Sequence, residues 1–89
     1  MKFPSGQIVA TPAALEALED SKQNASTFLA RHFKGDWGDV CKDDAASNEL
    51  ALQDGSRILS SYKTTKGVKI WIITEADRSS TCVLLPSDY

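Results

Sequence analysis

The stretch RILSSYK, residues 57–63, followed after a short gap by VKIWIIT, residues 68–74, decides the fold of this chain. Both segments are rich in Ile, Val, Tyr and Trp, and their side chains follow a period of two, which is typical of strands. The TTKG between them has the composition of a turn. A third segment of this kind spans residues 81–85. The C-terminal third is therefore expected to be a three-stranded antiparallel β-meander.

Upstream of Gly55 the periodicity is helical. Thr11 is expected to cap a short helix that starts with Pro12, because the N–H that proline lacks has no helical partner at that position. Gly35 is expected to stop a second helix and Gly55 a third. The predicted fold class is α+β, in the order of a short strand at Gln7–Ala10, helices that begin near residues 12, 26 and 42, and the meander.

Composition and length set the class of protein. The 89 residues, 42% hydrophobic and 25% charged, are expected to form a single α+β domain over residues 1–89. No apolar run approaches the roughly 20 residues of a membrane helix. The opening MKFPSGQIVA lacks the apolar core of a secretory signal, so a cytoplasmic location is expected. Cys41 and Cys82 are too few for a disulfide or metal framework and are expected to be buried free thiols.

Charge is unevenly divided along the chain. Residues 1–56 hold five basic and nine acidic side chains, and residues 57–89 hold five basic and three acidic ones. Such a split could steer a partner or an antiparallel self-association. The favoured interpretation is that the two halves fold against each other and largely cancel this difference.

The sheet suggests an interaction surface, because both of its faces are too apolar for water. A two- or four-residue turn would pair residues of opposite parity and place Ile58, Tyr62, Trp71 and Ile73 on one face. Unless helices cover it, this face is expected to bind a protein partner or a second copy in a homodimer, since aromatic anchors dominate such interfaces.

Nearly the whole chain also resembles a known family through three segments: GQIVATPAALEAL at 6–18, RHFKGDWGDV at 31–40 and KIWIITEADRSSTCVLLPSDY at 69–89. Between the last two, the resemblance rests on the spacing of Asp44, Asn48, Ala51, Gly55, Arg57 and Ser60. The family consists of small bacterial proteins of unknown function labelled "plasmid-related protein" or, in some members, "type I restriction enzyme subunit M". The resemblance implies a bacterial, often mobile-element origin. It supplies no activity or site residues, and the chain has no glycine-rich loop for a methyltransferase cofactor.

Few residues offer catalytic chemistry. His32 is the only histidine, so neither a metal-binding pair nor a relay can form, and a structural or solvent-facing role is expected. Glu75, Asp77 and Arg78 lie between two strands, where they could act as acid and base or bind a cation. A polar turn is the favoured interpretation. No enzyme activity, cofactor or metal is expected.

The motif GDWGD, residues 35–39, could be a site or a joint between helices. Asp36 and Asp39 lack the dense oxygen-ligand spacing of a calcium loop. A left-handed Gly35 would instead turn Trp37 toward the core as a wedge between the second and third helices, and the carboxylates would accept backbone N–H bonds. The joint is the favoured interpretation.

Two functions remain open. The first is a small protein-interaction or regulatory module without enzyme activity. The alternative is a nucleic-acid-binding or ribonuclease-toxin-like protein, because the order of elements resembles such toxins and five basic residues lie in the sheet half: Arg57, Lys63, Lys66, Lys69 and Arg78. Nucleic acid is the less favoured partner, since the chain is net acidic.

Overall fold

A computed structural model describes all 89 residues. Its elements in chain order are β1 (Gln7–Ala10), α1 (Pro12–Asp20), α2 (Ala25–Phe33), α3 (Lys42–Asp54), β2 (Ile58–Lys63), β3 (Lys69–Thr74), β4 (Ser80–Leu84) and the 3₁₀ helix η1 (Pro86–Asp88). The predicted N-terminal strand and three helices are confirmed. None of the helices has both the length and the apolar character needed to cross a bilayer.

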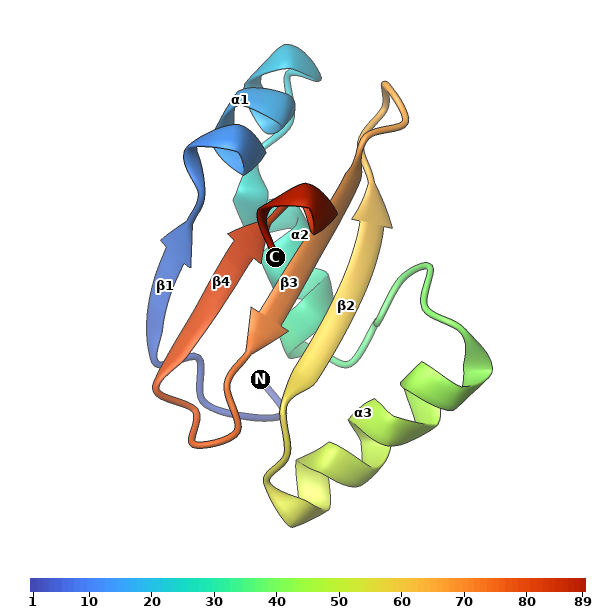
Figure 1. The fold of residues 1–89 in the computed structure, drawn as a ribbon. Coiled ribbons are helices and arrows are strands. Elements are labelled where there is room, and N and C mark those ends of the chain that lie inside the picture. The colour runs from blue at the N-terminus through green and yellow to red at the C-terminus, as the bar shows by residue number, and fades with distance from the viewer.

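The four strands form one mixed sheet in the order β1-β4-β3-β2 (Figure 1). β2, β3 and β4 pair antiparallel, whereas β1 pairs parallel with β4. The three C-terminal strands thus pair antiparallel as predicted, but the sheet as a whole has four strands and is mixed, so the description of it as a three-stranded antiparallel meander is wrong. Periodicity identifies a strand but not its neighbour, and the neighbour of β1 is the last strand of the chain.

The turn between β2 and β3 differs from the expected one. Residues 65–67 form a three-residue loop, in which the N–H of Gly67 donates to the C=O of Thr64 at 2.8 Å and Gly67 has a φ of +82°. A type I turn followed by a left-handed glycine gives this loop, whose odd length pairs residues of equal parity. Tyr62 consequently lies opposite Ile70, and the predicted assignment of β2 side chains to the two faces is wrong.

Local signals set the ends of the first two helices. Thr11 Oγ1 accepts the N–H of Ala14 at 3.2 Å, which confirms the predicted cap of α1. At the end of α2, Gly35 has a φ of +89°, and the N–H of Asp36 donates to the C=O of Arg31 at 2.9 Å. This is a Schellman motif, which requires a residue that tolerates positive φ.

Helices α1 and α2 lie over one face of the sheet, called here the helix-covered face, and α3 lies beside one end of β2 (Figure 1). The core between α1, α2 and the sheet consists of Ala14, Leu18, Phe28, Tyr62, Ile70, Ile72 and Val83. A second cluster lies near α3 and contains Phe3, Phe33, Trp37, Ala51 and Ile58. The first core packs α1 and α2 against the sheet, and the second packs α3 against β2.

Two other segments close the outer edge of β2. The side chain of Asn48 on α3 donates to the C=O of Leu59 at 2.7 Å and accepts its N–H at 3.1 Å. Farther along, the C=O of Trp37 accepts the N–H of Ser61 at 3.1 Å, and the N–H of Asp39 donates to the C=O of Ser61 at 2.6 Å. These bonds occupy backbone groups through which an edge strand could otherwise recruit another chain.

Trp37 is buried, as predicted, and its contacts support the interpretation of GDWGD as a joint. Its side chain is buried in the second core, where it packs with Phe33 of α2 and Ala51 of α3. Its indole Nε1–H donates to Glu49 Oε2 at 2.8 Å, so the one polar atom of the ring has a partner. Trp37 therefore connects the two helices to each other and to β2.

Replacing Trp37 with Ala should lower the free energy of unfolding by about 3–5 kcal/mol, because it leaves a cavity where α2 and α3 meet. Asp36→Ala is the control from the same motif and should cost at most about 1 kcal/mol, since its ion pair with Arg31 is exposed. Urea unfolding followed by circular dichroism measures both values. Near wild-type stability of Trp37→Ala would contradict the joint.

Gly38→Ala and Gly67→Ala compare two glycines of similar φ, +74° and +82°. A Cβ on Gly38 would overlap the carbonyl oxygen of Ser61, whereas a Cβ on Gly67 meets no atom within 4 Å. Gly67→Ala should therefore cost only the strain of a left-handed residue, about 1–2 kcal/mol. Gly38→Ala should cost clearly more and should speed amide exchange at Ser61. Equal losses in urea unfolding would show that this edge pairing contributes little.

Candidate functional site

The face of the sheet opposite α1 and α2 has no α-helix over it, and only η1 lies in front of it (Figure 1). We call it the open sheet face. The strand register gives it these apolar side chains: Val9, Leu59, Trp71, Ile73, Cys82 and Leu84. Ile73 and Leu84 are buried, Leu59, Trp71 and Cys82 are partly exposed, and Val9 is exposed.

The structure separates the four residues predicted to form one interaction face. Ile58 and Tyr62 lie in the cores, fully or almost fully buried, while Trp71 and Ile73 belong to the open sheet face. The prediction that all four share a face is wrong because the loop of residues 65–67 has three residues. Burial raises the pKa of Tyr62 to about 12, and its hydroxyl donates to a backbone carbonyl at 2.6 Å.

The last residues of the chain partly cover the open sheet face. Tyr89 meets Trp71 edge to face, with ring centroids 6.0 Å apart, and its hydroxyl accepts from Arg57 Nη1 at 2.6 Å. Tyr89 is nevertheless 73% exposed. Leu85 N–H and Thr11 Oγ1 both donate to the carboxylate of Asp88, which lowers the pKa of that carboxyl. The C-terminal segment is therefore held in place by hydrogen bonds at η1, while Tyr89 contacts Trp71 but remains mostly exposed.

Lysines gather beside this face, at the tip of the β2–β3 hairpin. Lys63 and Lys69 lie directly opposite each other in the register, and Lys66 lies in the loop between them. Like charges in a cross-strand pair repel each other. None of the three is in an ion pair: the only two ion pairs each lie within one half of the chain, so no ion pair cancels the charge difference between the halves.

A buried chain of polar side chains crosses the helix-covered face. His32 of α2 is fully buried, with Nδ1 2.5 Å from Ser60 Oγ and Nε2 2.9 Å from Thr74 Oγ1. Thr74 Oγ1 lies 2.8 Å from Thr81 Oγ1, and the Thr81 hydroxyl donates to the C=O of Ser5 at 2.8 Å. The chain thus joins α2, β2, β3, β4 and the segment before β1.

One direction of donation satisfies every member. The C=O of Ser5 only accepts, so Thr81 donates to it and Thr74 donates to Thr81. The Thr74 oxygen then accepts from Nε2–H of His32, and Nδ1 accepts from Ser60. Burial lowers the pKa of His32 to about 4, so the imidazole is neutral at pH 7, and this arrangement assigns its proton to Nε2. Of the two roles expected for His32, this is the structural one.

Asp36 and Asp39 play different parts in the joint. The Asp36 carboxylate accepts from Arg31 Nε at 2.7 Å and from the N–H of Gly38 at 3.3 Å, and the bond from Arg31 lowers the pKa of Asp36. Asp39 contributes one backbone bond to β2, from its N–H to the C=O of Ser61. Neither carboxylate caps α3, which begins at Lys42 without a side-chain cap. The predicted backbone bonds are therefore formed by Asp36 within the motif itself.

The turn that contains Glu75, Asp77 and Arg78 connects β3 to β4 and is hydrogen-bonded to α3. Asp77 Oδ1 accepts the N–H of Ser79 at 3.0 Å, as an Asp in a turn commonly does. Arg78 has a φ of +60°, and its guanidinium donates to the C=O of Ala51 in α3 at 2.9 Å. Glu75 forms an exposed ion pair with Arg57, with Nη2 3.5 Å from Oε1. The guanidinium of Arg78 therefore binds backbone carbonyls near the end of α3.

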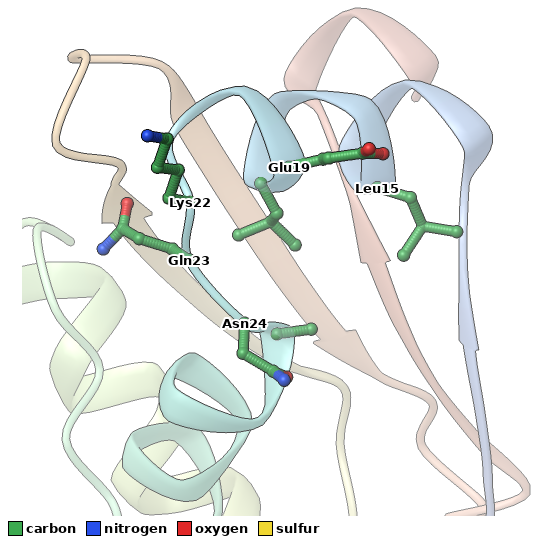
Figure 2. A pocket seen from close by; sticks show the side chains of 7 residues that line it. Leu15, Glu19, Lys22, Gln23 and Asn24 are labelled. Carbon is green, nitrogen blue, oxygen red and sulfur yellow. The ribbon is translucent and has the colours of Figure 1, made fainter.

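The surface also has two hollows, both beside α1. One of about 400 Å³ lies between α1 and the start of α2, and its lining includes Leu15, Glu19, Lys22, Gln23 and Asn24 (Figure 2). Another of about 310 Å³ lies between α1 and the β2–β3 hairpin. No side chain of the open sheet face lines either hollow, and of the three lysines at the hairpin tip only Lys66 lines the second one. Nowhere do three His, Cys, Asp or Glu side chains converge as metal ligands would.

Both cysteines are free, but neither is fully buried. Cys41 is exposed just before α3, and Cys82 is partly buried on the open sheet face, where burial raises the pKa of its thiol. The expectation of two buried thiols is therefore wrong.

Comparison with protein-family models, curated proteins and solved structures gave no match for this chain. The open sheet face is therefore identified as a candidate site from the geometry of the structure alone. Sequence reasoning missed Leu59, Val9 and Tyr89 as members of the open sheet face and its cover. Gly67 was the available signal for Leu59, because a glycine at the last position of a three-residue hairpin loop indicates odd length.

Because His32 is the only histidine, the interval from pH 7 to 5 isolates its effect on stability. Its folded pKa lies below the unfolded value, so stability is fully present above pH 6.5 and falls toward pH 4. We expect the free energy of unfolding to fall by about 2 kcal/mol between pH 7 and 5. Urea unfolding measures this, and ¹⁵N shifts of the imidazole should show the Nε2–H tautomer. A constant free energy of unfolding across this interval would contradict the neutral state of His32 in the folded protein.

Proposed function

We propose that this protein is a small interaction module without enzyme activity that binds a protein partner through its open sheet face. The observation that carries the proposal is the uneven covering of the sheet. Two helices cover one face, while the other has only η1 and Tyr89 over it. Partly exposed Leu59 and Trp71 remain beside them, and buried aromatic and aliphatic anchors of this kind dominate protein interfaces.

The surroundings of this face suggest the chemistry of the partner. Lys63 and Lys69 oppose each other at one end of the face without acidic partners in the chain. An acidic group on the partner would relieve their repulsion, whereas a basic one would increase it. We therefore expect an apolar patch with acidic residues at its border.

The alternative, nucleic-acid binding, is supported by fewer available basic residues than the sequence suggested. Arg78 is engaged with backbone carbonyls and Arg57 with Glu75 and Tyr89. Of the five basic residues considered for phosphate binding, only the three lysines at the hairpin tip have neither an ion pair nor a side-chain hydrogen bond to a backbone carbonyl. Three lysines can attract phosphate, but tight nucleic-acid binding requires more neutralised charges.

Leu59→Asp tests the proposed face, and Leu50→Asp, at an exposed leucine of α3, is the matched control. Each tagged protein is incubated with bacterial lysate, with and without ribonuclease, and bound molecules are identified by mass spectrometry and sequencing. We expect a protein retained by wild type and Leu50→Asp, and lost at least tenfold with Leu59→Asp.

Circular dichroism must show that both variants are folded. Retention that disappears with ribonuclease and with Lys63→Glu would favour the nucleic-acid alternative. Equal protein retention by Leu59→Asp and wild type would exclude the open sheet face as the docking surface.

A further inference from the structure

The free edge of the sheet is β1, whose outer side has no neighbour in the chain. β1 packs extensively only with β4. Ile8 is 49% exposed and Val9 is 40% exposed, although they point to opposite faces of the sheet. The other edge, β2, is closed by Asn48 and by the backbone of residues 37–39. The two edges of this sheet are therefore treated differently.

The hydrogen bonds to β4 show which backbone groups of β1 point outward. The N–H of Gln7 donates to the C=O of Ser79 at 3.0 Å, and that of Thr11 donates to the C=O of Val83 at 2.9 Å. In a parallel ladder alternate residues face the same neighbour. The N–H and C=O groups of Ile8 and Ala10 consequently point away from β4.

Nothing in β1 guards against pairing with another strand. Edge strands are commonly protected by Lys, by a proline within the strand or by a bulge. Gln7–Ala10 contains no charge and no proline. Pairing must stop at both ends of this segment, because Gly6 has a φ of +60° and Pro12 has no N–H.

We propose that two copies of this chain pair through antiparallel β1 strands, with Val9 on the twofold axis. In this register Ile8 of each copy lies opposite Ala10 of the other, which gives two symmetry-related pairs. Because both residues point their backbone groups outward, the two pairs form four hydrogen bonds. A second copy fits this edge best because the strand is complementary to itself in this arrangement. The four-stranded sheet then becomes one continuous sheet of eight strands.

Side chains on both faces support the same arrangement. Val9 would meet its own symmetry mate on the open sheet face, as a pair without hydrogen bonds whose Cα atoms approach to about 4.5 Å. On the helix-covered face, Leu15 is 52% exposed one helical turn after Thr11, at the side of α1 near β1 (Figure 2). The twofold axis would turn this end of α1 toward Ile8 of the other copy.

The short strand predicts a reversible dimer, since interfaces well below about 1,200 Å² are commonly weak. Sedimentation equilibrium from about 5 µM to 1 mM should show a shift from monomer to dimer. Val9→Lys and Val9→Glu should each raise the dissociation constant at least tenfold, because like charges would face each other across the axis. An equimolar mixture of these two variants should recover the dimer.

Leu50→Lys and Leu59→Asp are controls that leave β1 unchanged and should dimerise like wild type. Because Leu59→Asp tests the partner face, its effect on partner binding and the effect of Val9→Lys on dimerisation report separately on the two proposals. In a mixed-isotope sample, an NOE between the Hα atoms of the two Val9 residues would establish the register. A monomer at 1 mM, or no recovery in the mixture of folded variants, would overturn the β1 dimer.

Discussion

The hydrogen-bond chain through His32 is the constraint on which the rest of the arrangement depends. It joins α2 to β2, β3 and β4, and ends at the C=O of Ser5. A buried donor or acceptor without a partner costs more than a made bond contributes, so the members must remain together. Only one position of α2 over the sheet provides both ring nitrogens of His32 with partners.

This position has consequences at both ends of the chain. Phe3 packs edge to face against His32, with ring centroids 5.3 Å apart, and Ser5 follows two residues later. The segment before β1 is thereby fixed beside β4, where Gln7 begins the parallel pairing. With α1 and α2 both on the helix-covered face and α3 beside one end of β2, no α-helix covers the opposite face. The open sheet face and the free edge of β1 both follow from the same packing.

The third helix shows how a weakly amphipathic segment is held in place. α3 has no side-chain N-cap, and its apolar residues do not form one strong stripe. Specific polar contacts replace the missing stripe: Asn48 binds the backbone of Leu59, Glu49 accepts from Trp37, and Arg78 donates to the C=O of Ala51. α3 is therefore positioned by its partners in β2, in GDWGD and in the turn before β4.

The sequence by itself determined the order and the limits of the elements, since a cap at Thr11, a stop at Gly35 and a period of two after Gly55 depend on residues a few positions apart. It also indicated that Trp37 is a joint. Only the tertiary structure decided that β1 pairs with β4, that His32 meets Ser60 and Thr74, and that Ile58 and Tyr62 face the core while Trp71 faces outward. These outcomes depend on contacts between distant segments and on a single loop residue, because one residue more or less in a hairpin loop turns a whole strand over.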